Sequence, residues 1–470
     1  MHTTGTKTLA ALAVLLFACG DDGGSTPRPD SAPRPDAAPG TPDAADSPDA
    51  EPGTPDAMPT DDTTVFVRGD YAADNDIRVG RFVLGAAASP VTPTQVTTNT
   101  ADDFSVSADG SRIAYSSGDA LRAVDADGTD DIEVLATGGG DITDVAISPD
   151  GTTIAFRSDR VLAGMYDIYV IPAGAAAGTP VKVSPDRVVN DANADAQFIL
   201  AWSPDSRYLA YGGEFTTLDK NELHVWDTMT STRAVLIGAA DILAATAGGQ
   251  PTPGLVLPPV FAPGGKVIAL ARIALDGVRK LYRGDVGAAG ATLMTNGNRL
   301  RGGSPADVYT LALSNDGDTL AFATDDVTSG AFEVYTMPSD DSAAATRVTD
   351  GARPSGSPSR FDLMQFSPDD AKLAFNADWT LDEKYQPYVI VLATPTLRRL
   401  AIIGDAGSAS QDSTAFGWTA DSAALVFAAD DGQDNVAELY TLPITASDET
   451  NLVPVVEPPT GGDVFDVVTR

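Results

Sequence analysis

The chain offers few side chains for nucleophilic or metal chemistry. Its two histidines are His2 and His224, and its single cysteine is Cys19. A Ser-His-Asp triad needs an imidazole beside the nucleophile, and zinc sites need several His or Cys ligands. His224 lies in the apolar sequence ELHVW, where alternation predicts a packed or hydrogen-bonded histidine on one face of a strand. We therefore predict no catalytic residue, no metal ligand and no cofactor, and we expect that the chain is not an enzyme.

Carboxylates leave an alternative open, because calcium binds oxygen ligands and paired acids can transfer protons without histidine. The sequence DADGTDD, residues 125–131, places acidic side chains around Gly128. It resembles short calcium loops but lacks the closing Glu of the EF-hand pattern. NDANADA, residues 190–196, is a weaker candidate. The simpler interpretation of DADGTDD is an acidic hairpin turn, and calcium binding stays an open question.

The net charge is −36, from 30 basic and 66 acidic residues. A phosphate backbone is attracted by Lys and Arg, so this balance argues against nucleic acid as a partner. It also argues against peripheral binding to anionic lipid headgroups. The excess of acids is typical of a soluble domain outside the cell.

The first 18 residues have the order of a secretory signal. Lys7 provides the positive charge, and the apolar run over residues 9–18 is too short to span a bilayer as a helix. The run ends in LFAC, which resembles the bacterial lipobox. That resemblance implies lipidation at Cys19, the new N-terminus. The alternative is an ordinary signal peptide with an incidental cysteine.

Residues 19–62 have the composition of a disordered tether, consisting almost wholly of Pro, Asp, Ala, Gly, Ser and Thr. Such a segment cannot bury enough apolar surface to offset its ordering entropy, and Pro together with like charges keeps it extended. Gly20 follows the cysteine, with Asp one and two places later, which leans towards the outer rather than the inner membrane. The periplasmic or surface face stays open.

One pattern recurs over residues 63–470: an apolar strand, a turn such as SPDG, and an apolar strand with Ala at its centre. Successive turn positions lie 41, 55, 59, 52, 53 and 52 residues apart, and they are Asp109, Asp150, Asp205, Gly264, Asp316, Asp369 and Asp421. Pro presets a type I turn, Asp bonds back to the backbone, and Gly accepts the left-handed conformation. We expect these Asp residues to be structural before they are ligands.

The rest of each repeat supplies two further strands. A third strand reads DIYVIP, ELHVWD, KLYRGD, EVYTMP or ELYTLP, and a looser fourth strand follows, as in TRVTDG. A period near 50 with four short strands is typical of propeller blades. Trp202 and Trp418 precede the turn at equivalent positions, and with Trp226 and Trp379 we expect them to be core between blades rather than an exposed partner surface.

The two ends of the repeat region predict how the ring closes. VFVRGD from Val65 aligns with the second strand IAFRSD, whereas DVFDVV from Asp463 resembles a first strand. Together the ends form one composite blade, in which the C-terminal strand pairs with the N-terminal blade and hides a sheet edge. We therefore predict an all-β fold, a single β-propeller of eight four-stranded blades, with seven blades as the alternative.

The turn sequences WSPDS, ISPDG and FSPDD, each followed by LAY-like and DIYV-like strands, resemble the TolB-type (WD40-like, PD40) propeller repeats. The resemblance covers residues 63–470 and implies a propeller. The α/β domain that precedes the propeller in TolB has no counterpart here, and no segment reads G-x-S-x-G before a helix, as a peptidase of this repeat style would require.

These observations give a membrane-anchored β-propeller lipoprotein that acts as a protein- or ligand-binding scaffold in the bacterial envelope. The expected partner is an envelope protein or peptide. The alternative is a carboxylate- or calcium-dependent propeller enzyme, a lyase or hydrolase. A funnel of Asp, Glu, Arg and Tyr contributed by several blades would favour the enzyme.

Overall fold

The computed structural model describes residues 63–470 except 71–75, 85–91, 137, 139, 187–195, 244–252, 302, 350–360, 380–384, 402, 404–412, 431–436, 448, 450–451 and 457–463. Residues 1–62, with Cys19, lie outside the described part, as does NDANADA up to Asp195. Regular structure in the described part is entirely β. No helix there is long and apolar enough to cross a membrane.

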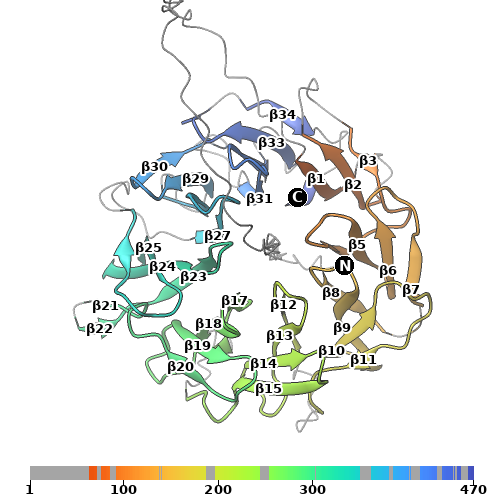
Figure 1. Ribbon diagram of the computed structural model, residues 1–470, viewed down its shortest axis with the longest axis horizontal. Coiled ribbons are helices and arrows are strands. Elements are labelled where there is room, and N and C mark those ends of the chain that lie inside the picture. The colour runs from red at the N-terminus through yellow and green to blue at the C-terminus, as the bar shows by residue number, and fades with distance from the viewer. Residues whose placement is uncertain are drawn as a thin grey trace, which may run out of the picture.

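Apart from one two-stranded hairpin, the strands form eight sheets that stand side by side around a ring (Figure 1). Blade 1 contains β35 (Val464–Thr469), β1 (Thr64–Gly69), β2 (Arg78–Val83) and β3 (Thr94–Gln95). Blade 2 contains β4 (Asp103–Val106), β5 (Arg112–Ser117), β6 (Ala120–Asp125) and β7 (Ile132–Leu135). Blade 3 contains β8 (Ile142–Ile147), β9 (Thr153–Leu162), β10 (Met165–Pro172) and β11 (Val181–Lys182). Blade 4 contains β12 (Ala196–Trp202), β13 (Tyr208–Gly213), β14 (Glu222–Asp227) and β15 (Thr232–Ile237).

The second half of the ring repeats this order. Blade 5 contains β16 (Gly254–Leu255) and β17 (Val260–Ala262), which both pair with β18 (Lys266–Arg272), then β19 (Lys280–Asp285) and β20 (Ala291–Leu293). A small hairpin of β21 (Leu300–Arg301) and β22 (Ser304–Pro305) precedes blade 6, which contains β23 (Val308–Leu313), β24 (Thr319–Thr328), β25 (Ala331–Pro338) and β26 (Thr346–Arg347). Blade 7 contains β27 (Phe361–Phe366), β28 (Lys372–Ala377), β29 (Gln386–Val391) and β30 (Thr396–Arg399). Blade 8 contains β31 (Ser413–Trp418), β32 (Ala424–Ala429), β33 (Glu438–Pro443) and β34 (Pro454–Val456).

The core lies between neighbouring blades, because the second strand of each blade is apolar on both faces. Phe156 of β9 and Leu121 of β6, for example, belong to one buried cluster shared by blades 2 and 3. Trp202 donates its indole N–H to the carbonyl of Ala146 in blade 3 at 3.0 Å, and Trp418 donates likewise to Gln365 in blade 7 at 3.3 Å. The predicted place of both tryptophans between blades is confirmed.

The ring closes through the two ends of the repeat region. β35 pairs antiparallel with β1, so that Val467 faces Val67 and Thr469 faces Val65. The backbones of Thr64 and Arg470 exchange two hydrogen bonds of 2.8 and 2.9 Å. The composite blade and the count of eight are confirmed, and the seven-bladed alternative is wrong.

Candidate functional site

The first turns of the blades form one rim of the molecule. In blade 3, Asp150 Oδ1 accepts hydrogen bonds from Ser148 Oγ at 2.6 Å and from the Thr152 N–H at 3.0 Å. Burial alone would raise the pKa of Asp150, but these hydrogen bonds outweigh it and lower the pKa below the ordinary value. Equivalent hydrogen bonds form at Asp109, Asp205, Asp316, Asp369 and Asp421. The predicted structural role of the turn aspartates is confirmed.

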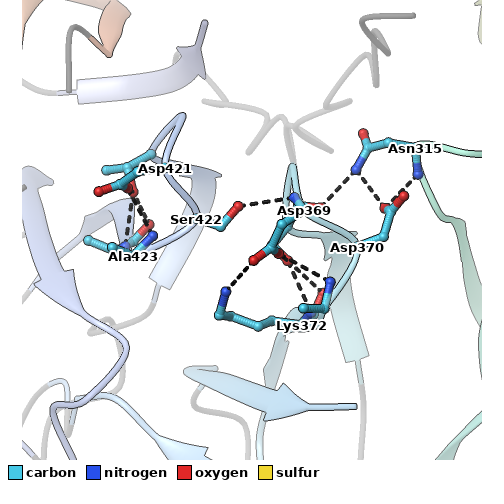
Figure 2. Close-up of polar contacts among 11 residues, drawn as sticks. Asn315, Asp369, Asp370, Lys372, Asp421, Ser422 and Ala423 are labelled. Atoms are coloured by element: carbon cyan, nitrogen blue, oxygen red, sulfur yellow. Dashed lines mark hydrogen bonds and ion pairs between the residues drawn. The ribbon is translucent and has the colours of Figure 1, made fainter. Parts of the chain in front are cut away.

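These turns are also joined from blade to blade (Figure 2). We call them the turn ring: residues 107–110, 148–151, 203–206, 262–265, 314–317, 367–370 and 419–422, with Thr63 and Arg470 in blade 1. Six links, each of 2.7 to 3.1 Å, are Asn315 to Asp370, Asp369 to Ser422, Ala420 to Thr63, Arg470 to Ser107, Ala108 to Pro149 and Asp150 to Ser206. Thr63 and Arg470, the first and last residues of the repeat region, thus occupy the place of an eighth turn and bond to blades 8 and 2.

The opposite end of the blades, which we call the loop rim, carries the connections between second and third strands and those between blades. Two hairpins, β9–β10 and β24–β25, are longer than the others. Asp159 fixes the first: its Oδ1 accepts the N–H of Asp141 and its Oδ2 that of Gly164, both at 2.7 Å. Asp325 holds the second in the same way, through Asp307 and Gly330. The hairpins of the loop rim therefore differ between blades, whereas six turns of the turn ring share one hydrogen-bonding geometry.

Near the loop rim, three innermost strands contain a β-bulge whose extra residue meets an arginine. Asp144 of β8 has a φ of 51° and lies 3.2 Å from Arg157 Nη1. Phe465 of β35 lies 5.5 Å from Arg68 Cζ, measured to its ring centroid. The third pair is Tyr309 of β23 and Arg279, with 4.4 Å from Arg279 Cζ to the centroid of the Tyr309 ring. Bulges redirect side chains and are enriched at functional sites. The pairs of blades 1 and 3, which lie on either side of blade 2, are therefore the candidate functional site.

Ion pairs and hydrogen bonds connect the charged side chains of the site across blades 1 to 3. Arg68 forms an ion pair of 2.5 Å with Asp466 and donates to the carbonyl of Asp102 in blade 2 at 2.8 Å. Arg157 lies over the ring of Tyr166, with 4.1 Å from its Cζ to the centroid. Asp103, at the start of β4, accepts the N–H of Val145 in blade 3 at 2.6 Å.

The pKa of Asp103 is shifted far from the ordinary value of an aspartate. Burial raises its pKa to about 7, and the charges of Asp144 and Asp466 act in the same direction. The hydrogen bond from Val145 and the charge of Arg68 oppose the rise. A carboxyl with a raised pKa thus lies beside two other carboxylates, an arrangement suited to proton transfer.

His224 is confirmed as a packed sheet residue. Its ring is 2% exposed, stacks on Tyr211 at 5.7 Å between centroids, and contacts Glu222 Oε2 through Nε2 at 2.9 Å. Burial lowers the pKa of His224, against the opposing effect of Glu222. The imidazole has no serine or cysteine nucleophile among its described hydrogen-bond partners.

The DADGTDD segment is a hairpin turn between β6 and β7, as the simpler interpretation predicted. Its carboxylates point to separate partners: Asp125 to Arg112, Asp131 to Arg122 and Tyr115, and Asp127 to the N–H of Thr129. Among the residues that the structure describes, no group of three or more His, Cys, Asp or Glu side chains is arranged to hold a metal ion.

Sequence reasoning missed the arginine and bulge pairs, although a signal for two of them was present. Arg68 and Arg157 occupy one position of the second strand, in VFVRGD and IAFRSD. Most other blades have a small residue there, such as Gly212, Ala323 or Ala428. A large cation in a place otherwise kept small indicates a local partner, which is Asp466 in one blade and Asp144 in the other.

The fold and its two unlike rims define an eight-bladed β-propeller. No family model matches the chain, and no curated protein matches it. Among solved structures, a putative TolB from Agrobacterium tumefaciens is 16% identical, with 72% of this chain and 88% of that chain covered and a TM-score of 0.34. An oligogalacturonate lyase in complex with manganese is 13% identical, covering 82% and 98%, with a TM-score of 0.47.

A third similar structure is the β-propeller domain of the Trilobed protease from Pyrococcus furiosus, 13% identical over 76% of this chain and 95% of that chain, with a TM-score of 0.45. At these identities the likeness shows the fold alone. The comparisons nevertheless contradict the prediction that the chain is not an enzyme, because this fold occurs in proteins named as a lyase and a protease. The shortage of histidine did not exclude an enzyme, since paired acids can transfer protons without it.

Proposed function

We propose that the chain is a lipoprotein, anchored through Cys19 to the bacterial outer membrane and held away from it by residues 19–62, whose propeller binds an envelope protein or peptide at the loop rim. The observation that carries the proposal is the unlikeness of the two rims. In the turn ring, polar side chains form hydrogen bonds within their own turn or to the turn of the next blade. The loop rim has longer hairpins, bulges and charged side chains in different combinations from blade to blade, as a recognition surface requires.

The anchor is tested by replacing Cys19. We expect the full chain expressed in a Gram-negative host to incorporate radiolabelled palmitate and to sediment with outer membranes, and Cys19→Ser to be released in soluble form. A Cys19→Ser chain that still incorporates label, or a wild-type chain that incorporates none, contradicts lipidation.

The binding face is tested by site-specific photo-crosslinking in the membrane-bound chain. Leu275 is 81% exposed at the loop rim of blade 5, and Met229 is 76% exposed beside the turn ring of blade 4. We expect a photoreactive residue at position 275 to crosslink one discrete envelope protein and the same residue at position 229 to crosslink none. Equal crosslinking at both positions would overturn the assignment of the loop rim.

The grouping of Asp103 with Asp144 and Asp466 favours a second candidate function, acid–base catalysis on a ligand bound beside blades 1 to 3. Asp103 would hold the proton, and Asp144 or Asp466 would stabilise positive charge that develops on the ligand. A screen of the purified chain against glycan and ester substrates at pH 6 to 8 tests it. Turnover that is lost in Asp103→Asn, with the circular dichroism spectrum of the folded chain retained, supports this function, and turnover retained in that variant contradicts it.

A further inference from the structure

Two hairpins of the loop rim are built alike but differ in their charge environment. β9–β10 and β24–β25 align residue for residue, so that Asp159 corresponds to Asp325 and Val161 to Val327. Both valines lie at hairpin tips, where they are 74% and 59% exposed. In each hairpin the aspartate accepts the N–H of the turn glycine, Gly164 or Gly330, so a side-chain hydrogen bond closes the turn next to the exposed valine.

The tip on blade 3 has the larger apolar surface. Leu162 follows Val161 and is 51% exposed, whereas the equivalent residue in blade 6 is Thr328. Arg160 precedes them, but its guanidinium turns back towards the ring of Tyr169, with 5.6 Å from its Cζ to the ring centroid. The blade 3 hairpin therefore exposes two adjacent apolar side chains, with its cation directed into the blade.

The acids of the loop rim differ between blade 6 and blades 2 and 3 in whether a cation neutralises them. In blade 6, Asp326 pairs with Arg299, and Asp307 pairs with Arg279 at 2.5 Å. Three carboxylates of blades 2 and 3 instead accept from neutral donors: Asp102 from the Gly118 N–H, Asp119 from the Gly138 N–H, and Asp141 from the Tyr166 hydroxyl. Among the residues described, none of these three has a cationic partner, so their negative charge stays available.

We propose that Val161 and Leu162, with Asp102, Asp119 and Asp141, form a docking surface for a basic segment of a partner protein that carries leucine-like side chains between its lysines or arginines. The inference rests on the proposed binding function and names the chemistry of its partner. The same charge repels the two other occupants that an apolar tip could have. An anionic lipid surface is repelled by the carboxylates, and a second copy brings the same negative charge.

The probe for this surface is a fluorescent synthetic peptide of alternating Leu and Lys, titrated into the full chain and followed by anisotropy. We expect binding that weakens as salt rises, and no binding of an alternating Leu and Glu peptide. The double variant Val161→Ser with Leu162→Ser should weaken binding by about five-fold or more, since it removes both apolar contacts. Asp119→Asn with Asp141→Asn should weaken binding and flatten its salt dependence.

The matched controls come from the chain itself. Val327→Ser changes the equivalent tip of blade 6, and Met229→Ser changes an exposed apolar residue on the opposite rim; both should bind the peptide as the wild type does. Equal loss in Val327→Ser and in the blade 3 variant would overturn the proposal. So would equal affinity for the Leu and Glu peptide, Val161-dependent binding to phosphatidylglycerol vesicles, or a dimer that Val161→Ser abolishes.

The two levels of the proposal fail separately. If position 275 still crosslinks an envelope protein but the Leu and Lys peptide does not bind, the docking chemistry is wrong and the binding function stands. If neither occurs, both are wrong.

Discussion

The same repeat gives the propeller two rims, one with a repeated turn geometry and one that varies from blade to blade. At the turn ring, nearly every blade places a Ser or Thr, an Asp and a left-handed residue in one geometry and bonds it to its neighbour. At the loop rim, the same blades differ in hairpin length, in bulges and in charge pairs. The comparison teaches that repetition in this chain builds the scaffold, and departures from repetition mark the surface available for function.

The largest effect should come from opening the ring. Deletion of residues 464–470 removes β35, leaves the edge of β1 unpaired and exposes the valines of blade 1. We expect loss of the cooperative thermal transition and aggregation of the purified chain. Arg470→Ala, which keeps β35 and removes the side-chain bonds to Ser107, Val106 and Thr469, is the control and should melt cooperatively at a modestly lower temperature. A cooperative transition in the deletion variant would show that closure is dispensable.

Removing one turn aspartate should cost an intermediate amount. Asp150→Ala leaves the Ser148 hydroxyl and the Thr152 N–H without their acceptor, and we expect the free energy of unfolding in urea to fall by about 1–3 kcal/mol. The control is Asp340→Ala, an exposed acid on the same side of the molecule. Equal effects of the two substitutions would mean that the turn ring adds no stability of its own.

The glycines of the two rims sharpen the same comparison. Gly317 in the turn ring and Gly277 at the loop rim have φ values of 77° and 70°. A Cβ at Gly317 would lie 2.5 Å from Cδ of Pro263 in the next blade, whereas a Cβ at Gly277 would have no atom within 4 Å. Both alanine variants lose about 1 kcal/mol to backbone strain, and Gly317→Ala should lose more because two blades must separate. Equal losses in urea unfolding would contradict close packing between these turns.

Asp103, near the loop rim, should make the free energy of unfolding depend on pH. Its folded pKa of about 7 lies above the ordinary value of 3.8, so between these values the folded chain binds more protons than the unfolded chain. The free energy of unfolding therefore falls as pH rises from about 4 to 7, through this group alone. Asp103→Asn should remove that component, so the variant gains stability relative to the wild type as pH rises. If the free energy of unfolding of the wild type and of the variant changed in parallel with pH, the pKa of Asp103 would be ordinary.

The smallest stability effect should be at the hairpin tip. Val161 is largely exposed and its backbone is held by Asp159, so Val161→Ser should change the free energy of unfolding by less than about 0.5 kcal/mol. Urea unfolding would detect a larger loss, which would mean that the tip packs against the blade and is not available to a partner.

The repeating parts of the molecule were predictable from sequence, and the exceptions were not. SPDG turns and Ala-centred strands recur because each blade needs the same turn and the same packed strand, and the mismatched ends, VFVRGD and DVFDVV, predicted the composite blade. The pair of Arg157 and Asp144 depends on a bulge with a positive φ at a non-glycine residue. The sequence around Asp144 contains no residue that would indicate such a bulge. The raised pKa of Asp103 depends on three strands meeting, β4, β8 and β35, which only the closed ring brings together.

Amide hydrogen exchange resolved to single residues tests the contrast between the rims most directly. The N–H groups of Ala108, Asp150 and Asp369 lie in turns, yet each bonds to the next blade. We predict that they exchange as slowly as the strands beside them, while the amides of Val161 and Val327 at the hairpin tips exchange orders of magnitude faster. Turn amides that exchange as fast as those tips, in a chain whose strands stay protected, would contradict the bonded ring.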